Sequence, residues 1–207
     1  MTTPLVKAHR ILACGLGVFL ILHFSIHLSA IGGVDIHLRG LMKFQGLYRN
    51  WLVEPLLIIA IMGQIFIGAR LLWRRWKSPT KGFWGWAQIL SGAYLVFFFI
   101  IHTSAALSTR HIVGLDTNFY WAAGTLQVGG LKYFFAPYYF LGVLSVFTHL
   151  AAAIFFGWTG KGAVMSKVIL FIGVIIASLI VCTFGGVFYD INIPVDYREY
   201  FEGFGIK

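Results

Sequence analysis

Charged side chains are scarce in this sequence: only 11% of its 207 residues are Asp, Glu, Lys or Arg, and the acids number just 7. A water-soluble domain usually carries about 25% charged residues, so this chain has too little polar surface to cover a soluble globule. The hydrophobic share of 59% also argues against a water-soluble protein. The sequence therefore predicts an integral membrane protein.

Cysteine is nearly absent as well, and both cysteines, Cys14 and Cys182, fall within apolar runs. No Cys-x-x-Cys-His sequence occurs, which excludes covalent attachment of a c-type haem. The chain also has no glycine-rich nucleotide-binding motif and no acid–base group of residues suited to a soluble substrate. We therefore expect no dehydrogenase active site on this polypeptide.

The net charge of +9 would by itself suggest a nucleic-acid partner, but the basic residues lie in short segments between apolar runs. Such placement follows the positive-inside rule of membrane proteins, so we expect no nucleic acid to bind. The bias is clearest in the segment 70–81, which has basic residues and no acid, whereas the acids fall on the other side of the predicted membrane. This places the N-terminus in the cytoplasm and the C-terminus outside.

Five apolar runs are long enough to span the roughly 30 Å hydrocarbon core of a bilayer as helices, which takes about 20 residues. They predict an all-α membrane protein with a single domain, a bundle of five transmembrane helices. The polar tail 190–207 is expected on the outer surface. The predicted helices cover about 9–33, 51–73, 84–108, 134–158 and 166–189.

Four of the 7 histidines lie well inside the predicted spans, where an ionisable side chain is costly and commonly marks a functional site. A lone histidine there often only hydrogen-bonds a neighbouring helix, whereas several on separate helices favour metal or haem ligation. The histidines between the spans, His37 and His111, are expected to be solvated. The four are His23 and His27 in the first predicted helix, His102 in the third and His149 in the fourth.

Depth in the membrane limits which histidines can pair, because a helix rises about 1.5 Å per residue. His23 lies about 21 Å from the inner end of its helix and His102 about 27 Å from the inner end of its own, so both fall in the outer half. They are expected to ligate one haem from opposite faces. His27, one turn beyond His23, is either a competing ligand or a contact for a propionate or quinone.

His149 lies about 22 Å from the outer end of its helix, in the inner half, and cannot share a haem with His23 or His102. At the matching depth of the second predicted helix stands Gln64, a poor ligand of haem iron compared with imidazole. An inner haem would therefore be five-coordinate or absent. Gln64 is then a packing residue that hydrogen-bonds His149.

Polar residues also lie at the predicted membrane surfaces. His9 and Arg10 begin the first predicted helix at the inner surface, where they face solvent, a quinone head group or a haem propionate. Glu54 and Pro55 open the second at the outer surface. Proline in the first turn and an acid near a helix N-terminus are ordinary structural features, so Glu54 has a plain explanation too.

Glycines and small polar residues recur at short distances from the membrane histidines. Glycine lets a flat ring approach the backbone, although close helix packing explains the same pattern without a cofactor. The small residues are Gly15 and Gly17 before His23, Gly92 and Ala93 before His102, Gly142 before His149, and Gly63 and Gly68 on either side of Gln64. Other residues stand at fixed distances from them: Gln88 and Ser91 before His102, Ser145 before His149, His9 before His23, Glu54 before Gln64, and Asn118–Phe119 between the third and fourth helices.

With these residues the first four predicted helices resemble the cytochrome b membrane anchor of succinate:menaquinone oxidoreductases and fumarate reductases, the single-polypeptide type with five helices and two haems. The resemblance implies an outer haem b held by His23 and His102. It implies an inner haem for which only His149 has a counterpart, since Gln64 stands at the position of the second histidine.

The resemblance also implies roles for polar residues beside the haem ligands. Gln88 and Ser91 are candidate contacts of haem or quinone, and Glu54 is a candidate for a quinone or proton role on the outer side. His27, Gln64, His9 and Arg10 complete this set of candidate contacts.

The function implied is that of the membrane subunit of succinate:quinone oxidoreductase in the respiratory chain of a bacterial cytoplasmic (inner) membrane. Its partners would be a FAD flavoprotein and an iron–sulfur subunit, and electrons would pass between the latter and menaquinone or ubiquinone. A higher oligomer of the complex stays open. So do two alternatives: a haem-poor membrane scaffold, and the cytochrome b subunit of another dehydrogenase, such as hydrogenase or formate dehydrogenase.

Overall fold

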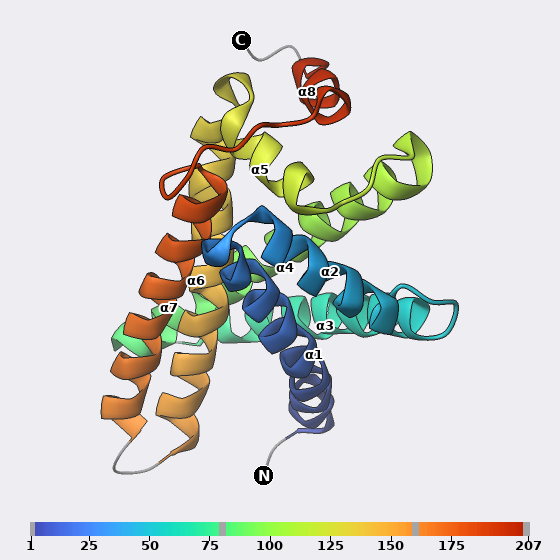
Figure 1. The fold of residues 1–207 in the computed structure, drawn as a ribbon. Helices are drawn as coiled ribbons and strands as arrows, with labels where there is room; N and C mark the ends of the chain where they lie inside the picture. Colours follow the sequence, from blue (N-terminus) through green and yellow to red (C-terminus); the bar gives the residue numbers. More distant parts are fainter. Residues whose placement is uncertain (1–2, 79–81, 159–161, 205–207) are drawn as a thin grey trace.

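The computed structural model describes residues 3–78, 82–158 and 162–204, in which the chain forms α-helices and no strand (Figure 1). Five helices are long and apolar enough to cross a membrane, which confirms the predicted number. Lys81, which belongs to the basic segment 70–81 used to orient the chain, lies outside the described residues. The five helices are α1 (Pro4–Ser29), α3 (Val53–Trp76), α4 (Gly82–Ser108), α6 (Lys132–Gly157) and α7 (Gly162–Phe184).

These five helices form a ring, because each contacts the next in chain order and α7 returns to contact α1. The pair α6 and α7 packs side by side (Figure 1), and at Gly173 of α7 a Cβ atom would overlap the ring of Phe147 of α6. Helix α3 has no buried residue, and Ile59, Met62 and Phe66 are each at least half exposed. Large apolar side chains exposed along a long helix indicate contact with a lipid bilayer.

Three shorter helices cover one end of the ring, which we call the capped end. The largest cluster of buried apolar side chains lies there, built around Ala30, Phe119, Phe184 and Phe201. The opposite end, which we call the basic end, holds the start of α1 and the end of α3. The helices of the capped end are α2 (Val34–Tyr48), α5 (Phe119–Gln127) and α8 (Val195–Glu202) (Figure 1).

Helix α2 occupies a segment that the sequence left as a connection between two spans. Its buried side chains, His37, Leu41 and Phe44, recur every three or four residues, while Arg39 and Lys43 between them are exposed. This is the pattern of an amphipathic helix with one face against the protein. With 15 residues it is too short for a span, and its charges place it at a surface.

Helix α7 ends at Phe184 rather than at the predicted boundary of 189. The N–H of Val187 donates to the Cys182 carbonyl at 2.9 Å, and the N–H of Gly186 donates to the Thr183 carbonyl at 3.1 Å. Gly186 has a φ of +77°, so these bonds form the Schellman motif that terminates many helices at a left-handed glycine. Continuous hydrophobicity hides this stop, because the apolar run extends past it.

The tail is anchored by α8, which packs on α5. Phe201 of α8 is 4% exposed, and a Cβ atom added to Gly124 of α5 would overlap its ring. We expect Gly124→Val to expel Phe201 at a cost of about 1–3 kcal/mol, since overpacking forces neighbouring groups apart. Limited proteolysis of the tail in the detergent-purified protein measures this loosening. Gly46→Val on α2 is the matched control, because its added Cβ meets nothing within 4 Å; equal cleavage rates in both variants would contradict the expectation.

Candidate functional site

A cavity of about 220 Å³ lies inside the ring, towards the capped end. Its walls are mostly apolar, yet four histidines line it. Ionisable side chains gathered around a chamber within a membrane protein mark a functional site by default. The four are His23 and His27 from α1, His37 from α2 and His102 from α4.

His23 and His102 face each other from α1 and α4, with ring centroids 6.2 Å apart and ring planes at 72°. Each ring stacks on an aromatic side chain one turn earlier in its own helix: Phe19 lies 5.6 Å from His23, and Phe98 lies 5.1 Å from His102. Gly142 of α6 leaves room for Phe98, because a Cβ there would overlap its ring. The structure thus brings together the two histidines that the sequence paired, and holds both rings.

The separation of these rings fits a metal bound between them. An imidazole nitrogen binds a metal at about 2 Å and lies roughly 1 Å from its ring centre, so two axial imidazoles have centroids about 6 Å apart. In the part of the chain that the structure describes, no three His, Cys, Asp or Glu side chains form a site for a bare metal ion. A facing histidine pair suits iron that already carries a planar ligand, as in b-type haem.

His27 and His37 extend this cluster. The Nε2 atoms of His27 and His23 lie 3.2 Å apart, and the rings of His27 and His37 stack at 5.7 Å. The predicted solvated position of His37 is wrong: its side chain is 1% exposed and also contacts Phe119 and Phe184. Burial lowers the pKa of His37 to about 4, so its ring is neutral at pH 7. Both ring nitrogens of His37 and the Nδ1 of His27 are buried without a hydrogen-bond partner, and can therefore serve a polar ligand group.

A second histidine pair lies nearer the basic end. His9 of α1 and His149 of α6 face each other with centroids 6.4 Å apart and ring planes at 77°. The Nε2 atom of Gln64 on α3 lies 3.4 Å from Nε2 of His9, so Gln64 contacts His9, whereas the sequence expected it to contact His149. Arg10, next to His9 in the chain, is exposed. The second pair therefore joins α1 to α6 and includes a histidine that the sequence assigned to the membrane surface.

Ser91 of α4 orients His149. The Ser91 hydroxyl donates to the Ala87 carbonyl at 2.6 Å, and its oxygen lies 3.2 Å from Nδ1 of His149. Because the hydroxyl proton is used on the carbonyl, Nδ1 of His149 donates to Ser91, and Nε2 keeps a free lone pair, as metal ligation requires. A Cβ at Gly92 would lie 3.2 Å from Cε1 of His149, so this glycine gives the ring its space. The carbonyl of Gln88 also accepts from Ser91 Oγ, at 3.4 Å.

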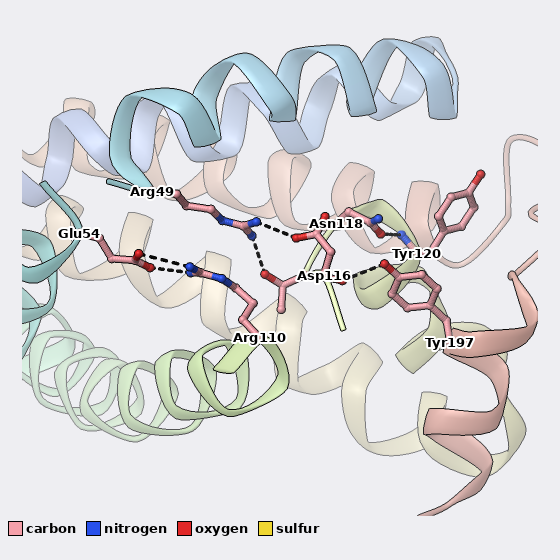
Figure 2. Close-up of polar contacts among 8 residues, drawn as sticks. Arg49, Glu54, Arg110, Asp116, Asn118, Tyr120 and Tyr197 are labelled. Atoms are coloured by element: carbon pink, nitrogen blue, oxygen red, sulfur yellow. Dashed lines mark hydrogen bonds and ion pairs between the residues drawn. The ribbon is translucent and has the colours of Figure 1, made fainter. Parts of the chain in front are cut away.

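Two ion pairs join neighbouring segments at the capped end (Figure 2). Arg110, beyond the end of α4, donates to both carboxylate oxygens of Glu54 on α3, at 2.5 and 3.2 Å. Arg49 donates to Asp116 at 2.6 Å and to the hydroxyl of Thr117 at 2.7 Å. Glu54 and Arg110 both line the cavity, so the charged pair forms part of its wall. Glu54 was singled out from the sequence; its partner Arg110 was not.

The C-terminal tail contacts this network through Tyr197 of α8. Its hydroxyl donates to the carbonyl of Asp116 at 2.9 Å (Figure 2), and burial raises its pKa to about 12, so the phenol remains a donor at neutral pH. Asn118, two residues on from Asp116, caps α5 by accepting the N–H of Tyr120 at 2.9 Å. The tail therefore fixes the segment that carries the partner of Arg49.

Comparison with protein-family models, with curated proteins and with solved structures found no match for this chain. The site is thus defined by its own geometry. Two pairs of facing histidines lie at different depths of the ring, and α1 contributes one member to each pair. Such an arrangement is suited to holding planar iron cofactors one above the other across a membrane.

Proposed function

We propose that this chain is the haem-b-containing membrane anchor subunit of a succinate dehydrogenase or fumarate reductase complex. It passes electrons between an iron–sulfur subunit and membrane quinone. The observation that carries the proposal is the His23–His102 pair: two imidazoles from separate spans, 6.2 Å apart, in an apolar cavity of a membrane protein. Haem b supplies one-electron redox chemistry when it is bound.

The contribution of the chain is to hold and surround that group. His23 and His102 would hold the haem iron, and Phe19 and Phe98 limit the rotation of their rings. The apolar walls of the cavity exclude water, which lowers the local dielectric constant and tunes the reduction potential of a bound iron. The unpartnered nitrogens of His37 are available to hydrogen-bond a propionate or a quinone carbonyl.

The basic end is the docking face in this proposal. Arg70, Arg74, Arg75 and Lys77 lie at or just beyond the end of α3, with no acid between them. By the positive-inside rule we expect this end to face the cytoplasm, with the chain in a bacterial inner membrane. A positive surface there favours an acidic iron–sulfur subunit that carries the flavoprotein beyond it. Quinone would exchange with the membrane along the lipid-exposed spans.

The test is purification of the intact complex from membranes through a tag on this chain. We expect a flavoprotein and an iron–sulfur subunit to co-purify, and a b-type reduced-minus-oxidised spectrum that succinate or a reduced quinone elicits. A purified complex without haem would favour the alternative of a haem-poor scaffold. A b-type spectrum together with hydrogenase or formate dehydrogenase subunits would support a cytochrome b, but one that belongs to another dehydrogenase.

A further inference from the structure

The pair near the basic end has the same geometry as the proposed outer ligand pair. The ring centroids of His9 and His149 are 6.4 Å apart, against 6.2 Å for His23 and His102. In both pairs the two histidines come from different spans, and in both the ring planes are steeply inclined, at 77° and 72°. A separation of about 6 Å is what a metal between two imidazoles requires.

The hydrogen bonds leave both of these histidines with a nitrogen suited to a metal. Nδ1 of His149 donates to Ser91, so its Nε2 carries the lone pair. Nε2 of Gln64 is an amide donor, so Nε2 of His9 is the acceptor and also carries a lone pair. At 3.4 Å this contact is longer than the usual length of about 2.9–3.0 Å, and the Oε1 atom of Gln64 is buried without a partner. Gln64 therefore holds His9 only weakly and can turn away from its nitrogen.

Two glycines let the backbones of neighbouring helices approach these rings. A Cβ at Gly68 of α3 would lie 3.5 Å from Cε1 of His9, and a Cβ at Gly92 of α4 would lie 3.2 Å from Cε1 of His149. Each ring of the pair thus has a glycine backbone beside it. The glycines thus make room for the two imidazole rings, since a larger side chain at either position would crowd Cε1 of its histidine.

We infer that His9 and His149 are the axial ligands of a second, inner haem b, and that His9 on α1 takes the role of the ligand that α3 lacks at Gln64. Gln64 packs beside His9 and is not a ligand in this arrangement. The inference rests on the proposed function. Helix α1 then supplies one ligand to each of two haem sites, which the rise between His9 and His23 separates by about 21 Å along its axis.

The experiment uses the purified complex and compares the wild type with His9→Ala, His149→Ala, Gln64→Ala and the exposed-site control His111→Ala. We expect two haems b per chain in the wild type, neither of which binds carbon monoxide after reduction, because both irons are six-coordinate. His149→Ala should halve the haem content. His9→Ala should either halve it or leave one haem that is high-spin and binds carbon monoxide, and added imidazole should reverse that binding. Gln64→Ala and His111→Ala should keep two six-coordinate haems.

The outer haem serves as the folding control, because its spectrum must persist in every variant of the inner pair. Three results would overturn the inference. The first is two low-spin haems in His9→Ala that do not bind carbon monoxide, and the second is carbon monoxide binding that appears in Gln64→Ala but not in His9→Ala. The third is a wild type with a single haem, which the further variant His102→Ala removes. The third result leaves the proposed function intact. A wild-type complex without any haem would contradict both the inference and the proposed function.

Discussion

If His23 and His102 hold the proposed outer haem, replacing His102 by alanine is expected to abolish its binding, with complete loss of its contribution to the b-type spectrum. His102 has no neighbour that can take over its role, because His27 and His37 lie beside His23 on the opposite wall of the cavity. An iron with one imidazole loses an axial bond, and haem b has no covalent link to hold it in the protein. Haem content per purified complex, measured as the pyridine haemochromogen, checks the loss.

The matched control is His111→Ala, since His111 continues the same helical segment and is exposed in the π-helical turn Thr109–Val113. It should retain the full haem content. His23→Ala is a weaker test than His102→Ala, because Nε2 of His27 lies 3.2 Å from Nε2 of His23 and can replace it from one turn further along α1. The double variant His23→Ala/His27→Ala should lose the outer haem completely. Full haem content in His102→Ala would contradict the outer site.

The depth of each histidine in the membrane could be predicted from the sequence, whereas its neighbours on other helices could not. The fixed rise per residue and the fixed thickness of a bilayer put His23 and His102 at one level and His149 at another, and the structure pairs them accordingly. His9 was expected only as a contact at the inner surface, and not opposite His149, because the predicted first helix began at residue 9. Thr3 caps α1 and Pro4 opens it, so His9 lies inside the helix and not at its surface end.

The capped end was the part of the fold that hydrophobicity described least well. Helices α2, α5 and α8 are short and mix polar with apolar residues, so a search for long apolar runs passes over them. The period of three to four in α2 was the signal that would have placed His37 inside. No local pattern identifies the pairing of Glu54 with Arg110, because the two residues are 56 positions apart in the chain.

Replacing Arg110 by alanine is expected to lower the stability of the protein by about 3 kcal/mol, because it leaves the largely buried Glu54 carboxylate without its bidentate partner. The side chains of Arg110 and Glu54 are only 15% and 19% exposed, and two hydrogen bonds join them. Water therefore screens this pair less than an ordinary surface ion pair. For a chain of this size the loss corresponds to a fall of about 6–12 °C in melting temperature. Thermal unfolding of the detergent-purified protein measures it.

The double variant Glu54→Leu/Arg110→Met separates the cost of an unpaired charge from the value of the pair itself. Removing both charges leaves no buried ion to solvate, so most of the lost stability should return even though the ion pair is gone. Arg39→Ala on the exposed face of α2 removes the same kind of charge at the same end of the ring and should change the stability by less than about 0.5 kcal/mol. If Arg110→Ala melted with the wild type, the pair would be an ordinary surface contact. If the double variant melted at the same low temperature as Arg110→Ala, the stability loss would come from the missing bidentate bond between α3 and the end of α4. The burial of an unpaired carboxylate would then not be its cause.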